Sequence, residues 1–173
     1  SRNSISHNLL AATSGLRLFF SHSMKAVVQR VENASVKIDG REHSSIGQGL
    51  FVLLGIHKED TGLDIDWMVR KIANMRIFED ENGLMNSDLS TVQGELLVVS
   101  QFTLMASTKK GNRPSFNDAA DPEKGNAFYL RVVDGLESTL NRPVQTGVFA
   151  ADMQVSLVND GPVTIALDTR HRE

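Results

Sequence analysis

The chain has 173 residues, a formal net charge of −3, no cysteine, 40% hydrophobic residues and 23% charged residues, which is the size and composition of one globular domain. The lack of cysteine excludes disulfides, thiolate metal sites and cysteine nucleophiles, and no apolar run reaches the roughly 18–20 residues that a membrane-spanning helix needs. The mildly acidic balance gives no general reason to expect nucleic acid as a partner, so such a contact would have to rest on a local cluster of positive charge.

Residues 1–23 differ in composition from the rest of the chain. They contain Arg2 and Arg17, several serines and no acidic residue, which is typical of an organelle transit peptide. A cloning remnant or translated upstream sequence would look the same, because Met24 resembles a natural start. We therefore expect an N-terminal extension over residues 1–23 and the folded domain over residues 24–173. Without targeting the protein would be cytoplasmic, and with it mitochondrial or plastid.

The first part of the domain has the pattern of β-strands. Apolar and polar residues alternate from Ala26 to Ile38, and Asp39-Gly40 then predicts a hairpin turn, because glycine accepts a positive φ. Leu50–Ile56 is a continuous apolar run, which is typical of a strand buried on both faces.

The pattern then changes to helical spacing. Thr61 and Asp64 resemble a capping box at the start of a helix, and apolar residues follow at intervals of three and four as far as Met75. A second buried strand is expected over Glu95–Leu104, and residues 105–118 form a polar loop.

A second helix is expected near residue 121. Asp121-Pro122-Glu123 is a typical helix start, because an acid caps the first turn and proline fits the first helical position. Its apolar face is predicted at Ala127, Leu130, Val133, Leu136 and Leu140. Two last strands follow, Met153–Val158 and Val163–Leu167.

These elements together predict an α/β fold in a single domain. We expect three layers, α/β/β, with two mostly antiparallel or mixed sheets whose strands are mostly linked by hairpins, and two helices that cover one sheet face.

The histidines suggest neither a catalytic triad nor a metal site. His7 and His22 lie in the N-terminal extension, and His171 is close to the C-terminus. His43 and His57 stand at a hairpin and at a strand end, where surface positions are usual. The sequence contains no motif of serine hydrolases, zinc proteases or P-loop proteins. We therefore expect no metal and no other cofactor.

The segment Ser100-Gln101-Phe102-Thr103 places hydrogen-bonding side chains at the end of a buried strand. Such side chains often cap unpaired backbone groups. Alternatively, backbone N–H groups at this edge face a pocket and stabilise negative charge that develops on a carbonyl oxygen. The Thr103 hydroxyl is a possible nucleophile, but the sequence shows no base that would activate it.

The segment Asn159–Thr164 (NDGPVT) is the second one with unusual chemistry. Such a sequence between strands is usually only a turn. A cis bond between Gly161 and Pro162 would instead turn two carbonyl groups the same way. Rigid carbonyls of this kind could exclude a substrate group by its stereochemistry.

The two segments, in this order, resemble the signature motifs of the D-aminoacyl-tRNA deacylases, which include the D-tyrosyl-tRNA deacylases. The resemblance extends over essentially all of residues 24–173. It includes the opening MKAVVQRV, RIFED, the loop STKKGNRPSF and the late GVFAADMQVSLVNDGPVT. Each motif alone is weak, but the ordered set is specific.

The resemblance implies a cofactor-free homodimer that hydrolyses the ester between a D-amino acid and the 3′ end of tRNA, a proofreading activity in translation that also removes glycine from mischarged tRNA. Aminoacyl esters are already activated, so positioning and N–H donors could suffice for this chemistry. The alternatives are a non-catalytic nucleic-acid-binding module of the same fold and a general hydrolase of small esters.

The resemblance also assigns roles to residues. Gly161 and Pro162 would enter the active site of the other subunit and exclude an L side chain, with Arg30 fixing their loop and Met153 contributing to substrate binding. The catalytic segment would comprise Ser100, Gln101, Phe102 and Thr103. Within it, the Phe102 N–H would bind the ester carbonyl oxygen, and either the Thr103 hydroxyl or the 2′-hydroxyl of the terminal ribose would assist hydrolysis.

The polar loop contains three cations and no acid between Lys109 and Arg113. It is either a solvated mobile loop or a set of phosphate contacts beside the tRNA. In the second case Lys109, Lys110 and Arg113 bind RNA.

Overall fold

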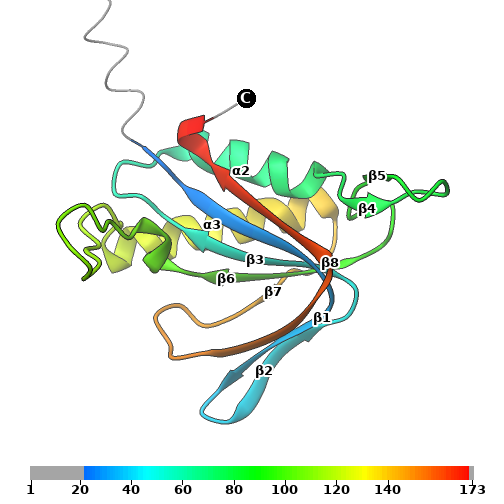
Figure 1. The fold of residues 1–173 in the computed structure, drawn as a ribbon, viewed down its shortest axis with the longest axis horizontal. Coiled ribbons are helices and arrows are strands. Elements are labelled where there is room, and N and C mark those ends of the chain that lie inside the picture. Colours follow the sequence, from blue (N-terminus) through cyan, green and yellow to red (C-terminus); the bar gives the residue numbers. More distant parts are fainter. Residues whose placement is uncertain (1–21, 172–173) are drawn as a thin grey trace, which may run out of the picture.

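Two helices lie against one side of a strongly bent β-sheet in the computed structural model, which describes residues 22–171 (Figure 1). The elements in chain order are β1 (Lys25–Ile38), β2 (Arg41–Ile46), β3 (Gly49–Gly55), α2 (Gly62–Asn74), β4 (Phe78–Glu79), β5 (Met85–Ser87), β6 (Glu95–Ser100), the 3-10 helix η1 (Phe102–Met105), α3 (Pro122–Leu140), β7 (Gln145–Thr146), β8 (Gln154–Asp168) and the 3-10 helix η2 (Thr169–His171).

The main sheet is mixed. Its strand order is β2-β1-β3-β6-β7, and β8 pairs with β1. The three pairs made by β1 are antiparallel, whereas β3–β6 and β6–β7 are parallel. Parallel neighbours need crossovers rather than hairpins, and α2 and α3 lie within them. β4 and β5 form a small second sheet. The predicted α/β class is confirmed.

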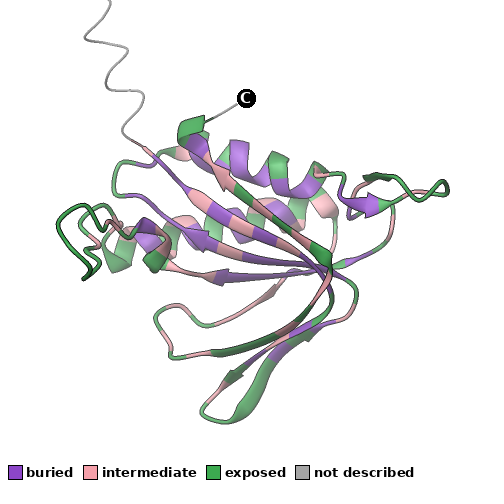
Figure 2. Cartoon of the chain, in the orientation of Figure 1, coloured by how far each residue is buried: buried purple, intermediate pink, exposed green. Residues whose placement is uncertain are grey.

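The bend in the sheet creates the third layer. The second half of β1, β2 and the first half of β8 turn away from the helices (Figure 1). One apolar cluster joins this part to β3 and β6: Val31, Ala34, Val36, Ile46, Phe51, Leu97 and Val99. A larger cluster lies between the helices and the sheet and includes Leu54, Met68, Ile72, Val98 and Leu136. Figure 2 shows both as buried segments.

The local signals for turns and helix starts are confirmed. Asp39 and Gly40 both have positive φ, 51° and 75°, as a two-residue hairpin turn requires. Thr61 caps α2 with both halves of the capping box formed to Asp64. Asp121 caps α3, and proline occupies the first turn.

The strand predicted over Glu95–Leu104 is wrong at its C-terminal end. β6 ends at Ser100, and Phe102–Met105 forms the 3-10 helix η1. The neighbouring strand β3 ends at Gly55, and the Gln101 N–H makes the last bond to it, to the Leu54 carbonyl. Beyond that point β6 has no partner strand on this side, so apolar character alone cannot continue the sheet.

The two strands predicted over Met153–Val158 and Val163–Leu167 are one strand, β8. It pairs with β1 along its length. The register shifts around Val31 of β1 accommodate the unpaired residues between Asn159 and Thr164 of β8. The turn signal of Asn159–Thr164 therefore produces an irregularity inside a strand, because the long β1 supplies a partner on both sides of it.

The predicted buried face of α3 is confirmed at Val133, Leu136 and the partly buried Leu140, and is wrong at its N-terminal half. Ala127 and Leu130 are exposed, and the residues that pack inward are Gly125, Tyr129, Val132, Val133 and Leu136. Tyr129 is fixed there by a 2.7 Å hydrogen bond from its hydroxyl to the Val98 carbonyl. Within residues 22–171, no helix is long and apolar enough to cross a membrane.

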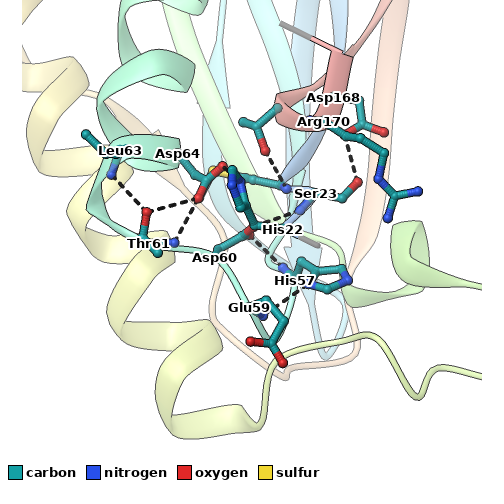
Figure 3. A network of polar contacts seen from close by, with 12 residues as sticks. His22, Ser23, His57, Glu59, Asp60, Thr61, Leu63, Asp64, Asp168 and Arg170 are labelled. Atoms are coloured by element: carbon teal, nitrogen blue, oxygen red, sulfur yellow. Dashed lines mark hydrogen bonds and ion pairs between the residues drawn. The ribbon is translucent and has the colours of Figure 1, made fainter. Parts of the chain in front are cut away.

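The predicted N-terminal extension lies outside the described residues except for His22 and Ser23. Ser23 is buried; its N–H donates to Asp60 at 3.0 Å and its hydroxyl to Asp168 at 2.7 Å. His22 contacts the Asp64 carboxylate at 2.7 Å (Figure 3). These two residues therefore pack on the domain, whose boundary after residue 23 stays a prediction.

Candidate active site

The end of β6 carries the first candidate segment. The Gln101 N–H bonds to β3, and the chain then turns into η1. There the Leu104 N–H donates to the Gln101 carbonyl, and the Ala106 N–H donates to the Thr103 carbonyl. The first N–H groups of a helical turn have no partner within that turn. The start of η1 therefore leaves the Phe102 and Thr103 N–H groups available as donors, on residues that are both exposed.

The Thr103 hydroxyl is hydrogen-bonded to the side-chain amide of Gln101. An amide has no basic site at neutral pH, whereas a hydroxyl nucleophile needs a base that takes its proton. This contact positions the Thr103 side chain without activating it. The geometry favours a backbone donor site at η1 over a threonine nucleophile.

The polar loop folds back onto η1. The Phe116 ring packs edge-on against Phe102, with ring centroids 5.1 Å apart. Two backbone hydrogen bonds of 2.9 Å join Ser107 and Ser115, and they close the loop. The cations Lys109, Lys110 and Arg113 lie exposed on the closed part. No sequence pattern singles out Phe116, because a ring contact across a loop has no periodicity.

Met153 lies beside the end of β6. A Cβ atom added to Gly147 would be 2.5 Å from the Met153 Sδ and 3.5 Å from a Val99 methyl group, so Gly147 lets Met153 approach the strand. Since Val99 directly precedes Ser100, the structure brings Met153 to the segment that the sequence marked as catalytic.

Gly161 and Pro162 form an exposed irregularity in β8, and the peptide between them is cis. The Asn159 side chain spans it: Oδ1 accepts from the Val163 N–H at 2.7 Å, and Nδ2 donates to the Val163 carbonyl at 3.2 Å. These bonds fix the backbone on both sides of the glycine–proline pair. Asn159 is a positioning residue that the sequence analysis did not single out.

Arg30 holds the same segment from β1. Its Nε donates to the Asp160 carbonyl at 2.9 Å, and a guanidinium terminal nitrogen donates to the Ile77 carbonyl at 2.7 Å. Arg30 is only 8% exposed. Charge-assisted bonds of this kind are short and strong, so the guanidinium fixes Asp160 next to Gly161.

The two candidate segments do not meet within one chain. Arg30 is opposite Leu50 at the start of β3, and Gln101 bonds to Leu54 near its end. Four positions of extended strand correspond to about 13 Å. The end of β6 and the middle of β8 accordingly lie at opposite ends of the sheet (Figure 1).

A separate polar network surrounds the start of α2 (Figure 3). Ligand atoms of His22, Asp60 and Asp64 lie within 4.8 Å of one another, a spacing that could hold a metal ion. Both carboxylates already accept backbone hydrogen bonds, Asp60 from Ser23 and His57, and Asp64 from Thr61. The network ties the N-terminal residues to α2 and shares no residue with either candidate segment.

Burial and hydrogen bonding shift the pKa values of this network in opposite directions. Burial raises the pKa of Asp60 to about 7, with the nearby Asp64 carboxylate adding to the rise. Hydrogen bonds from Thr61, Thr169 and His22 outweigh burial and lower the pKa of Asp64. His57 was expected at the surface but is buried, because Ala119 pairs with it across the loop; burial lowers its pKa.

Comparisons with known proteins show which proteins the chain resembles. Residues 27–168 match the family model of D-Tyr-tRNA(Tyr) deacylase. The chain is similar to the D-aminoacyl-tRNA deacylase of Cytophaga hutchinsonii, with 56% identity over 150 residues that cover 87% of this chain and 100% of the relative. The corresponding protein of Chlorobaculum tepidum is 57% identical over 146 residues, which cover 84% and 97%.

Two solved structures are also similar. A structure titled c-Myc DNA Unwinding Element Binding Protein has a TM-score of 0.79 and 48% identity, and the match covers 83% of this chain and 97% of that one. A structure of a probable eukaryotic D-amino acid tRNA deacylase has a TM-score of 0.73 over 84% of this chain and 99% of that one. At 16% identity, the second likeness shows the fold alone.

Proposed function

The chain belongs to the D-Tyr-tRNA(Tyr) deacylase family, hydrolases of the ester bond of D-aminoacyl-tRNA, and we propose that it cleaves this ester at the end of β6. The main support for this position of the active site is the turn at η1, which takes the Phe102 and Thr103 N–H groups out of the sheet. Donors held by the fold can stabilise a developing oxyanion without reorganising during the reaction.

The proposed reaction needs no side-chain nucleophile. Water adds to the ester carbonyl carbon while the Phe102 N–H donates to the carbonyl oxygen, and the carbon–oxygen bond to the ribose then breaks. The departing ribose oxygen takes up a proton, and free D-amino acid and tRNA are released. The neighbouring ribose 2′-hydroxyl assists proton transfer in this scheme, because the Thr103 hydroxyl is bonded to an amide that cannot act as a base.

We propose that a second copy of the chain completes the site. Gly161 and Pro162 are exposed and held by Arg30 and Asn159, yet they lie at the far end of the sheet from Phe102. A homodimer in which this segment enters the partner's site would bring the two together. This distance and this exposure support the proposal.

The backbone of Gly161–Pro162 would select the D isomer. An L side chain, pointing the other way from the same ester, would collide with backbone atoms fixed by Arg30 and Asn159. Rejection by rigid backbone acts on geometry and tolerates many D side chains. Met153, beside the end of β6, would line the side-chain pocket.

The exposed loop cations Lys109, Lys110 and Arg113 would contact tRNA phosphates. The bridge between Ser107 and Ser115 and the Phe116 ring hold this loop against η1. An enzyme of aminoacyl-tRNA works where translation occurs, and we propose the cytoplasm as that compartment.

The test is the hydrolysis rate of one tRNA charged with D- or L-tyrosine. We expect rapid loss of the D ester and slow loss of the L ester. Equal rates on both isomers would contradict the proposed chiral selection, and tRNA binding without turnover of either ester would favour a non-catalytic binding module.

A further inference from the structure

A hollow of about 1050 Å³ lies beside the end of β8. We call it the β8 hollow and define it by residues of four segments that line it beside β8: Trp67, Arg70 and Lys71 on α2, Lys25 at the start of β1, His171 in η2, and Leu104 of η1. Apart from Leu104, these residues did not enter the candidate site. The hollow is therefore a concave feature that the proposed reaction does not yet use.

The charge of the β8 hollow is opposite to that of the whole chain. Lys25, Arg70 and Lys71 are its basic residues besides His171, and the acidic residue in its lining is Asp168. One carboxylate oxygen of Asp168 already accepts bonds from the Ser23 hydroxyl at 2.7 Å and the Arg170 N–H at 2.9 Å. In a chain of net charge −3, this places a positive concavity on an otherwise acidic molecule, which favours an anionic ligand.

Regular elements hold the cations in place. Positions 67, 70 and 71 share one face of α2 because residues three and four apart are neighbours on a helix. The Lys71 Nζ lies 5.6 Å from the centre of the Trp67 ring. Side chains carried on a helix and a strand need less ordering on binding than the cations of the 109–113 loop.

The β8 hollow also reaches the candidate active site. Leu104 forms part of its wall and belongs to η1, the turn that begins with Phe102. The Leu104 N–H bonds to the Gln101 carbonyl, so the wall and the proposed oxyanion donor are parts of one short turn. An extended polyanion lying in the hollow would pass directly beside the reacting ester.

We propose that the β8 hollow binds the sugar–phosphate backbone of the tRNA acceptor end, with Lys25, Arg70 and Lys71 neutralising successive phosphates. This inference rests on the proposed function and names the surface through which the substrate is held. Removing these cations weakens binding of the RNA part of the substrate and leaves the chemistry at η1 unchanged.

The double variant Arg70→Gln and Lys71→Gln tests this assignment, because both side chains are exposed on α2. Its matched control is Lys37→Gln with Arg41→Gln, an exposed pair on the β1–β2 hairpin. For D-tyrosyl-tRNA we expect KM to rise roughly tenfold with kcat unchanged, and the salt dependence of kcat/KM to weaken by about 1.5–2 in its log–log slope. The control variant should behave as the unaltered protein.

A small substrate separates binding of the RNA from chemistry. D-tyrosyl-adenosine lacks the rest of the acceptor end, so the double variant should hydrolyse it at the unaltered rate. Loss of activity on this substrate as well would overturn the proposal, since the variant would then have damaged η1. An unchanged KM and salt slope for the charged tRNA would overturn it too.

Trp67 gives a readout that does not need turnover, because it is the one tryptophan of the chain. Titration with an uncharged acceptor-stem hairpin should change its fluorescence, and the double variant should need roughly tenfold more RNA for the same change. If neither ester is hydrolysed but this signal is present and depends on Arg70 and Lys71, the result contradicts the proposed hydrolysis and supports RNA binding in the β8 hollow. An RNA titration that leaves Trp67 unchanged while charged tRNA is hydrolysed would overturn the surface alone.

Discussion

The Arg30 Nε donates to the Asp160 carbonyl oxygen at 2.9 Å, and the same guanidinium reaches the Ile77 carbonyl at 2.7 Å. One buried cation thus joins β1, the segment before β4 and the irregular middle of β8. Because Asp160 directly precedes Gly161, this contact decides where the exposed glycine–proline pair points.

Replacing Arg30 by lysine should weaken discrimination between isomers. A lysine can reach one of the two carbonyls but lacks the planar fork that serves both. We expect the ratio of D to L hydrolysis rates to fall about tenfold, the equivalent of a lost charged hydrogen bond of about 1.5 kcal/mol. The two rates on charged tRNA measure it. An unchanged ratio in a folded variant would show that Arg30 does not position the pair.

Phe102→Pro should remove the proposed oxyanion donor while keeping the turn. Proline fits the first helical position, and Gln101 before it already lies outside the α-helical region that a following proline disfavours, at φ −142° and ψ 84°. We expect kcat to fall about 10²–10³-fold. The matched control is Phe102→Ala, which keeps the N–H and loses the contact with Phe116. If both variants lose the same activity, the ring rather than the N–H is what matters.

Thr103→Ala should retain most of the activity, within about threefold of the unaltered kcat, because the hydroxyl is bonded to an amide, which cannot act as a base. A charged tRNA whose terminal ribose lacks the 2′-hydroxyl should in contrast be hydrolysed about 10²–10⁴-fold more slowly. Single-turnover rates on the two substrates provide the comparison. Near-complete loss of activity in a folded Thr103→Ala protein would instead support the Thr103 hydroxyl as the nucleophile.

Mixed dimers can show whether the site is shared between subunits. Gly161 has φ 143°, and a Cβ there would lie 2.9 Å from the Val163 backbone nitrogen, so Gly161→Ala should displace the segment. In a heterodimer of the Gly161→Ala chain and the Phe102→Pro chain, one site is intact. The first chain supplies its Phe102, and the second chain supplies its Gly161–Pro162. Selective hydrolysis of the D ester should return on mixing. Mixing without recovery, in a sample shown to contain heterodimers, would contradict a site shared between subunits.

Asp60 should make the protein less stable as the pH rises towards 8. Its pKa is about 7 in the folded state against 3.8 in its ordinary state, so its stabilising contribution is present in full below about pH 4 and is lost as the pH passes through about 7. Relative to Asp60→Asn, the free energy of unfolding should fall by about 2–4 kcal/mol from pH 5 to pH 8. Urea denaturation across this range measures the difference, and parallel curves for both proteins would contradict it.

The sequence by itself determined the features that depend on neighbouring residues. The Asp39-Gly40 turn, the capping box of Thr61 and Asp64 and the proline start of α3 are encoded within a few residues, because φ preferences and side-chain caps act locally. The ordered motifs likewise indicated the family, since they name residue types rather than contacts.

Only the tertiary structure decided what depends on a partner far along the chain. β6 ends at Ser100 because β3 ends beside it, and β8 is one strand because β1 pairs with both of its halves. Contacts between distant segments also explain why His57 is buried and why the Phe116 ring packs on Phe102. They likewise bring together the cations of the β8 hollow. Hydrogen bonding and packing between distant segments leave no periodic trace in sequence, and they place Phe102 and Gly161 at opposite ends of the sheet.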